Sequence, residues 1–296
     1  MNSNFDFGNF KWIDLEAPDS EELRGLIEKY DLPYEFAHEL ITESARPRVE
    51  SADAFVYGVL HFPILMNQKS LTEQELDFIL SDKLLITTHY KASSTLEYIK
   101  KELEANNINY ASPNVLFLNI LMRFYQRVED QVNETEDMLE DIEEAIFEGK
   151  EKDMVVALSF VGRDILNLRQ ALEPHKDILK SIKQEFSFSG SEKEILQSID
   201  NLYYKIMRKV YELKASLQEL RETNNSLLST KQNEVMKIFT ILAFVTFPLS
   251  LVASLFGMNT KHIPIVGMPY DFWIVIALMS LATIFMFAYF KHKKWL

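Results

Sequence analysis

The residues with the clearest capacity for chemistry lie along one face of an apolar segment near the C-terminus. They are separated by 3, 3, 8, 3 and 9 positions: Asn233, Met236, Phe239, Phe247, Ser250 and Asn259. At about 100° per residue, the first five share one broad helical face and Asn259 continues it. Neutral oxygen rings can hold the hydration shell of an ion, and apolar rings can gate a pore by dewetting. The combination predicts an ion pathway, although a single Met or Phe on a membrane helix more often faces lipid or a neighbouring helix.

Two apolar segments must position these side chains. No charged residue occurs from Ile238 to Thr260 or from Phe272 to Phe290, and a spanning helix needs about 20 apolar residues. The basic flanks, including the tail KHKKWL, place both outer ends in the cytoplasm. We therefore expect membrane helices at 237–259 and 272–290, an external loop at 260–271 and a cytoplasmic tail at 291–296. A pair of buried helices in a soluble core is the alternative.

The N-terminal part, residues 1–190, predicts an α+β cytoplasmic domain in which helices flank a mixed sheet. Val, Ile, Phe and Tyr with near-alternation indicate strands in FKWIDLE, in RPRVESADAFVYGVLHFPILM and in LDFILSDKLLITTHY. Helical patterns begin at Asp19 and after Pro33, and longer ones cover 94–107, 112–149 and about 154–186.

A nearly heptad apolar seam follows the break at 187–194. It contains Ile195, Ile199, Leu202, Ile206, Val210, Leu213, Leu217 and Leu220. Neither proline nor glycine occurs from Ser191 to Phe247, so we expect a stalk at 191–236 to continue into the first span as one helix of about 65 residues. Such a helix must pack against copies or neighbours, and a hairpin with the 154–186 helix is an alternative for part of it. Two spans cannot enclose an aqueous path, so a pore requires several chains.

Charge and composition exclude several classes of function. The net charge is −13, and the +4 carried from Lys231 onward leaves −17 on residues 1–230. Residues 1–230 are therefore a poor candidate for nucleic-acid binding, because contacts to phosphate need clustered Lys and Arg. The absence of cysteine removes thiolate metal sites and disulfides. No P-loop, glycine-rich nucleotide loop, nucleophile elbow or HExxH occurs, so we expect neither an enzyme nor an organic cofactor.

The run NEVMK at 233–237, then Pro248 and a closing Gly257-Met258-Asn259, resembles the CorA family of divalent-cation channels. The stretch RPRVE at 46–50 and the order of elements fit the same family. The resemblance implies a homopentameric funnel in a bacterial inner membrane, with Gly257, Met258 and Asn259 as selectivity filter. It implies that Asn259 binds hydrated Mg²⁺ through its amide oxygen, and that Gly257 lets the backbone turn there. Mg²⁺, with Co²⁺ or Ni²⁺ as incidental permeants, would enter the cytoplasm down the membrane potential.

The loop departs from the family pattern in one respect. Many members carry Met-Pro-Glu shortly after the asparagine, whereas this chain has Ile263-Pro264-Ile265 preceded by Lys261 and His262. The missing acid leaves open a Zn²⁺ uptake function, because a zinc-transporting branch of the family has less acidic loops. His262 is a candidate transition-metal ligand, although a single loop histidine is usually only solvated. A third alternative is a membrane-anchored coiled-coil scaffold or sensor that conducts nothing.

Acidic residues of the cytoplasmic part are candidates for regulation. In the family, Mg²⁺ bound between cytoplasmic domains holds the pore closed, so the resemblance implies intersubunit Mg²⁺ sites. The candidates are Asp77, Asp82, Glu136, Asp137, Glu140 and Glu144. A solvated acidic helix face is the competing interpretation of the last four.

Overall fold

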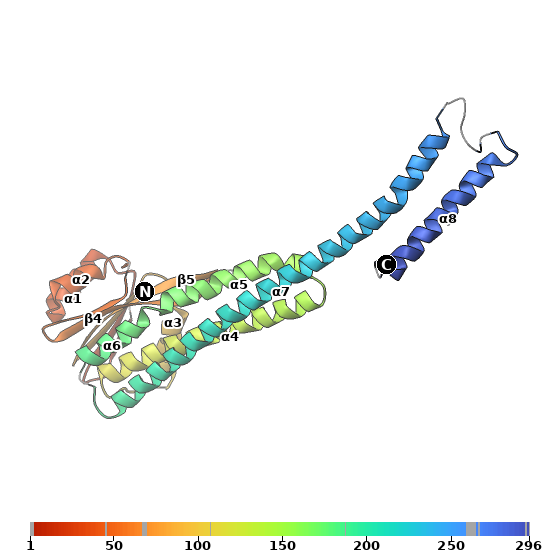
Figure 1. Cartoon of the computed structure of the whole chain (residues 1–296). Coiled ribbons are helices and arrows are strands. Elements are labelled where there is room, and N and C mark those ends of the chain that lie inside the picture. Colours follow the sequence, from red (N-terminus) through yellow and green to blue (C-terminus); the bar gives the residue numbers. More distant parts are fainter. Residues whose placement is uncertain are drawn as a thin grey trace. The chain divides into compact units, whose positions relative to one another are not determined.

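The computed structural model describes residues 3–44, 46–66, 70–106, 108–186, 188–258, 265, 267–293 and 295. The chain divides into two compact units, residues 1–221 and residues 222–296 (Figure 1). The strands are β1 (Ser3–Asp6), β2 (Lys11–Glu16), β3 (Arg48–Ala52), β4 (Phe55–Met66), β5 (Ser70–Ser81) and β6 (Leu84–His89). The helices are α1 (Ser20–Tyr30), α2 (Tyr34–Glu39), α3 (Ser94–Asn106), α4 (Pro113–Phe147), α5 (Glu151–Leu172), α6 (His175–Glu185), α7 (Ser191–Phe256) and α8 (Asp271–His292).

The first unit contains the mixed sheet that the sequence predicts. Its strand order is β1-β2-β6-β5-β4-β3, with β2 parallel to β6 and every other neighbouring pair antiparallel. The short strand β1 was not predicted, because SNFD has no apolar alternation. Register places Asp14 of β2 opposite Thr87 of β6, so residues 73 positions apart in sequence become neighbours.

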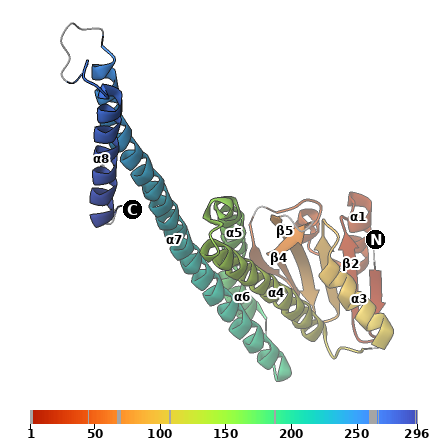
Figure 2. The ribbon, with the colours of Figure 1, turned by 90° about the vertical axis from the view of Figure 1, so that its right-hand side faces the viewer.

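Both faces of the sheet are covered by helices (Figure 2). On one face, α1 and α2 bury Leu23 and Phe36 against strand residues such as Tyr57. A capping box at Asp19 fixes the start of α1, as the sequence predicts. On the other face α4 packs its aromatic side chains against the strands, and the ring centroids of Phe78 and Phe117 lie 4.3 Å apart.

The single helix expected at about 154–186 is wrong, because the structure divides it into α5 and α6. Pro174 lies at the break, where a proline lacks the N–H and its ring clashes with the preceding turn. The buried His175 follows directly: its Nε2 lies 2.9 Å from the carbonyl of His61, and its Nδ1 lies 2.7 Å from the Tyr125 hydroxyl. These two bonds attach the start of α6 to β4 and α4.

Within the first unit, the apolar seam of α7 is buried inside a single chain. Residues such as Ile206, Val210 and Leu217 are at most 4 % exposed. Lys205 pairs with Glu129 of α4 at 2.7 Å, and the Arg221 guanidinium donates to the Leu158 carbonyl of α5. The seam therefore packs against α4 and α5, which matches the hairpin alternative for this part of the helix.

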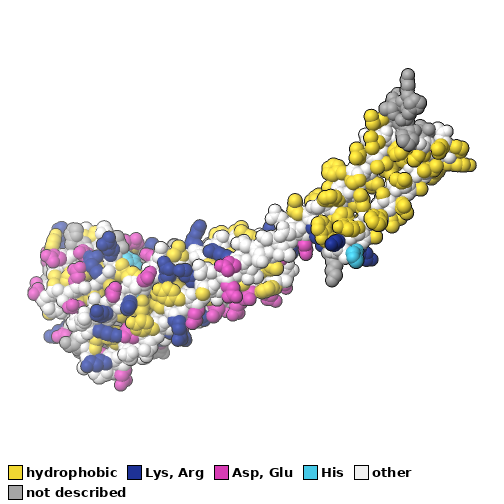
Figure 3. Space-filling model, in the orientation of Figure 1, with side chains coloured by type: hydrophobic (Ala, Val, Ile, Leu, Met, Phe, Trp, Pro, Cys, Tyr) yellow, Lys and Arg dark blue, Asp and Glu magenta, His cyan; other side chains and the backbone are white. Residues whose placement is uncertain are grey.

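The second unit contains the remainder of α7 and all of α8. Both helices are long and apolar enough to cross a membrane, and the most apolar window of each is only 11 % and 0 % buried. Apolar side chains predominate on the visible surface of the apolar segments of both helices (Figure 3). Core helices of a soluble protein would be mostly buried, so exposure on this scale favours membrane spans.

Candidate functional site

The pathway residues predicted from the sequence lie on one uninterrupted helix. α7 runs for 66 residues from Ser191 to Phe256 with Pro248 inside it, which confirms the single long helix expected from the sequence. A proline at this position leaves the carbonyl of residue 244 without its usual backbone donor. Continuity fixes the angular positions of side chains along the helix, so those positions can be compared directly.

Among the described residues of the second unit, α8 packs against one side of α7. The contact consists of Ile241 and Val245 of α7 with Phe290 of α8, and Leu249 and Met286 pack at its edge. At about 100° per residue, the three α7 positions span about 80° of the helix circumference. This side is therefore occupied within one chain.

The five described pathway residues, Asn233, Met236, Phe239, Phe247 and Ser250, lie on the opposite side of α7. Their mean direction is about 180° from the α8 contact, by the same 100° rule. All five described members are exposed in a single chain, with Met236 57 %, Phe239 62 % and Phe247 74 % exposed, and Asn233 and Ser250 exposed as well. α8 thus leaves uncovered a face on which amide, hydroxyl and large apolar side chains occur.

The end of α7 coincides with the predicted filter sequence. The Gly257 N–H donates to the Ala253 carbonyl at 2.9 Å, and the Met258 N–H donates to the Leu255 carbonyl at 3.3 Å. Gly257 does not adopt a left-handed φ, and a Cβ placed there would lie 3.2 Å from the Ala253 oxygen. The missing side chain therefore gives close backbone approach at the helix end, and no left-handed turn is involved. Asn259 lies outside the described residues, as do Lys261, His262, Ile263 and Pro264.

The single acid of the predicted external loop, Asp271, is engaged at the start of α8. Its carboxylate accepts from the Gly267 N–H at 3.1 Å and from the Phe272 N–H at 2.7 Å. A carboxylate in this position satisfies free backbone donors and complements the helix dipole. Ile265, at the position of the usual family acid, has a φ of 80°. Asp271 therefore serves the backbone of α8 in this structure.

The six candidate regulatory acids do not converge within one chain. Asp82, Asp137, Glu140 and Glu144 are exposed, and Glu136 is paired with Lys209 at 2.5 Å. Among the residues that the structure describes, no group of three or more His, Asp or Glu side chains is placed to hold a metal ion. A Mg²⁺ site built from these surface acids would need donors from a second chain.

Asp77 lies inside the sheet. Its side chain is fully buried on β5, where the Tyr90 hydroxyl donates to it at 3.1 Å. Burial, and next the charge of Glu75 on the same strand face, raise the pKa of Asp77 to about 9. A neutral, enclosed carboxyl of this kind fits a structural role better than a surface ligand.

A second buried polar cluster was not identified from the sequence. Asp14 accepts from the Thr87 hydroxyl at 2.6 Å and pairs with Lys100 at 2.9 Å and His89 at 3.4 Å. Burial raises the pKa of Asp14, but the bonds from His89, Thr87 and Lys100 outweigh burial and lower it overall. The only signal in the sequence is an acid between apolar residues in KWIDLE, and its partners depend on the pairing of β2 with β6.

Comparison with known proteins gives a consistent result over nearly the whole chain. The family model described as CorA-like Mg²⁺ transporter protein matches residues 7–292. The cobalt/magnesium transport protein CorA of Methanocaldococcus jannaschii is 24 % identical over 96 % of this chain and 91 % of its own length. The protein of the same description from Thermotoga maritima is 25 % identical over 87 % of this chain and 75 % of its own.

The solved structures agree with the sequence relatives. The complete structure of the CorA magnesium transporter from M. jannaschii matches with a TM-score of 0.83 at 19 % identity, covering 99 % of this chain and 93 % of that one. The match includes the sheet domain, the long helix and both apolar C-terminal helices, so it supports the architecture expected from the sequence.

Proposed function

Because the chain belongs to the CorA-like Mg²⁺ transporter family, we propose that it conducts hydrated Mg²⁺ through a pore lined by the face of α7 opposite α8. Membership of a transporter family argues against the enzyme classes that the sequence already disfavours. The observation that carries the proposal is the uncovered α7 face, where Asn233, Met236, Phe239, Phe247 and Ser250 are all exposed in a single chain. A non-conducting, membrane-anchored scaffold or sensor gives no reason for polar side chains on the membrane part of this face.

A pore of this kind requires several copies of the chain. One α7 and one α8 cannot surround water, whereas a closed ring of α7 helices with α8 outside can. We propose a homopentamer in a bacterial inner membrane with both chain ends in the cytoplasm. The position of α8 supports this arrangement, because it covers only the side of α7 that would face away from the axis.

The chemistry of the filter follows from the preferences of Mg²⁺. This ion gives up its water reluctantly and prefers oxygen ligands. A ring of Asn259 amide oxygens would accept hydrogen bonds from the retained waters without the strong trapping that carboxylates would cause. The inward membrane potential supplies about 2.3 kcal/mol per elementary charge per 100 mV, or about 4.6 kcal/mol for a divalent ion. No nucleotide hydrolysis is needed.

Regulation by cytoplasmic Mg²⁺ is the finer part of the proposal. Mg²⁺ bound between copies by exposed acids such as Asp137, Glu140 and Glu144 would hold neighbouring chains together and keep the pore closed. Their exposure and the absence of a complete donor set in the described part of one chain are compatible with sites shared between chains.

Zn²⁺ uptake remains the second candidate, and the loop sequence favours it. Ile265 replaces the usual acid, and the one acid present, Asp271, is bonded to backbone N–H groups. A less negative mouth concentrates divalent cations more weakly. His262 adds a nitrogen ligand of the type that Zn²⁺ accepts.

The test is flux of Mg²⁺, Co²⁺ and Zn²⁺ into proteoliposomes, with and without a pH gradient. We expect Mg²⁺ flux in the wild type and a fall of about tenfold or more in Asn259→Ala, equivalent to at least about 1.4 kcal/mol at the filter. Met268→Ala, an exposed loop residue, is the matched control and should conduct normally. Unchanged Mg²⁺ flux in Asn259→Ala would refute the filter, proton-coupled Zn²⁺ flux would favour the second candidate, and no flux of any ion would favour a scaffold.

A further inference from the structure

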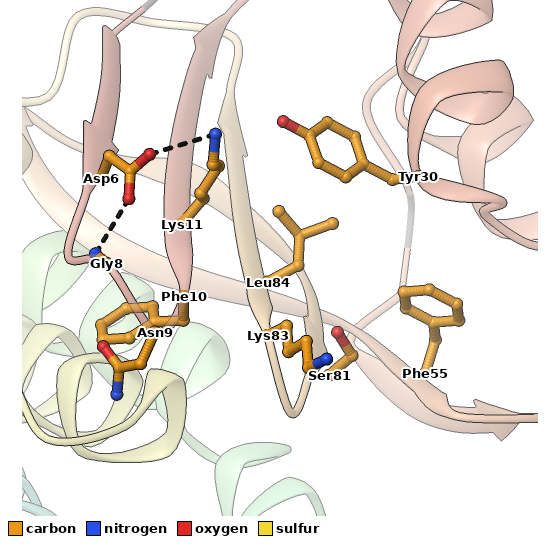
Figure 4. Close-up of a pocket in the computed structure, with 10 residues that line it drawn as sticks. All are labelled: Asp6, Gly8, Asn9, Phe10, Lys11, Tyr30, Phe55, Ser81, Lys83 and Leu84. Carbon is orange, nitrogen blue, oxygen red and sulfur yellow. Dashed lines mark hydrogen bonds and ion pairs between the residues drawn. The ribbon is translucent and has the colours of Figure 1, made fainter.

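The first unit contains a cavity that the transport function does not use. It has a volume of about 420 Å³ and lies between the β1–β2 hairpin, the end of α1 and the β5–β6 hairpin. The residues that matter for its chemistry are Asp6, Lys11, Tyr30, Phe55, Lys83 and Leu84 (Figure 4). Sites for small organic ligands typically measure about 300–1,000 Å³ and combine apolar walls with a few polar groups.

The Tyr30 hydroxyl is the first indication of a ligand. It is buried and has no hydrogen-bond partner among the described residues. Figure 4 shows the ring extending from α1 above Leu84, with its hydroxyl directed toward Lys11. A buried hydroxyl without a partner costs free energy that a bound acceptor or donor would recover.

The charges around the cavity favour an anion. Lys11 and Lys83 line it, and Asp6 is the one acid among the lining residues, paired with Lys11 at 3.1 Å. Lys83 is exposed and forms no ion pair with any residue that the structure describes. A third ammonium, that of Lys29, lies 5.1 Å from the centroid of the Tyr30 ring. The described lining residues therefore carry a net charge of +1, in a part of the chain, residues 1–230, that carries −17 overall.

The remaining walls favour a flat apolar group. Phe55 and Leu84 line the cavity between the Tyr30 ring and the β5–β6 hairpin (Figure 4). Aromatic rings prefer offset or edge-to-face contact with such side chains. The cavity therefore offers an apolar surface next to ammonium groups.

We propose that this cavity binds a small organic anion that carries an aromatic ring, of about the size of a nucleoside monophosphate. The ring lies against Phe55 and Leu84, the phosphate or carboxylate is bound by Lys83, and the Tyr30 hydroxyl and Lys11, at the other end of the cavity (Figure 4), bond to a polar edge of the ligand. A lysine can bind a phosphate as a point charge without a glycine-rich phosphate loop. The site is independent of the pore, so its test requires no ion flux.

The test uses AMP as probe, with adenosine and inorganic phosphate as separate arms, titrated by calorimetry into the full-length chain in detergent. We expect saturable binding of AMP below about 1 mM and at least tenfold weaker binding of each fragment. Lys83→Ala should weaken AMP binding about tenfold. Tyr30→Phe, which removes only the unpartnered hydroxyl, should weaken it about threefold to tenfold.

Lys152→Ala is the matched control, because Lys152 is an exposed lysine on α5 that does not line the cavity. It should bind AMP as the wild type does, and far-ultraviolet circular dichroism should show that all variants are folded. No AMP binding up to about 10 mM, or equal weakening by Lys83→Ala and Lys152→Ala, would overturn the proposal. Phosphate binding as tightly as AMP would overturn the role of the aromatic ring.

Discussion

Replacing Asp77 by asparagine should stabilise the protein at neutral pH, although Asp77 is a buried polar residue. Asp77 is fully buried and its pKa is raised to about 9, by burial first and by Glu75 second. At pH 7 the folded state therefore holds a proton on this carboxyl, whereas in the unfolded chain the group is ionised above its ordinary pKa of 3.8. Asparagine has the shape of the protonated acid and keeps an acceptor for the Tyr90 hydroxyl.

The sign and size of the effect follow from proton linkage. Between pH 3.8 and about 9 the folded wild type binds one more proton at Asp77 than the unfolded chain does, so this group's contribution to stability is complete below pH 3.8 and falls as the pH rises. The loss is about 1.4 kcal/mol per pH unit, or about 4 kcal/mol from pH 5 to pH 8. The variant lacks this dependence. For a domain of this size, about 4 kcal/mol corresponds to about 8–16 °C in Tm.

The assay is thermal unfolding of the full chain in detergent at several pH values. The Tm of Asp77→Asn minus that of the wild type should increase steadily from pH 5 to pH 8, and other titrating groups cancel in this difference. Asp82→Asn, an exposed acid in the adjacent turn, should give a small and nearly constant difference. A difference for Asp77→Asn that does not change with pH, or a variant less stable than wild type at pH 8, would refute the assignment of a neutral Asp77.

Two substitutions of glycine test close packing in the first unit, both measured by chemical unfolding of the full chain. Gly58→Ala places a methyl group 2.3 Å from the buried Phe78 ring and should cost about 1–3 kcal/mol in the free energy of unfolding; an unchanged midpoint would show that the ring moves freely. In Gly162→Ala the new Cβ would lie 2.3 Å from the Arg221 guanidinium. The guanidinium should then lose its hydrogen bond to the α5 backbone, which should cost about 1 kcal/mol in the free energy of unfolding. Gly25→Ala, where a Cβ meets nothing within 4 Å, is the control.

Local patterns in the sequence were sufficient to predict most elements of the fold. The strand alternation, the Asp19 cap of α1 and the absence of proline and glycine from Ser191 to Phe247 each depend on neighbours in sequence. The break between α5 and α6 was missed even so. The apolar periodicity continues through Pro174, so periodicity alone predicts one helix. The break follows only when the backbone hydrogen bond that proline cannot donate is also considered.

The interior of the sheet domain could not be predicted in the same way. The partners of Asp14 depend on β2 lying parallel to β6, which brings residues more than 70 positions apart into contact. The Tyr30 cavity likewise joins α1 with two hairpins that are distant in sequence. Asp77 was recognised as an acid, but its burial follows from strand order and from the helices that cover that face.

The pathway face was predicted from spacing alone, and the structure adds a reference direction to it. The sequence gives the relative angles of Phe247 and Ser250, but it does not show which side of α7 meets α8. The contact through Val245 and Phe290 supplies that direction. The residue roles on this face stay predictions until they are measured in an assembled channel.

Single cysteine substitutions test the central claim, that the α7 face opposite α8 lines the ion pathway, most directly. The chain contains no cysteine, so each variant carries one defined thiol. A positively charged, membrane-impermeant thiol reagent should block Mg²⁺ flux through Phe247→Cys and Ser250→Cys channels. It should leave flux unchanged in Leu242→Cys, because Leu242 is exposed in one chain but lies outside the pathway face. It should also leave flux unchanged in Val245→Cys, because Val245 is buried against α8. Block of the Leu242 variant with no effect on the Phe247 and Ser250 variants would contradict the account.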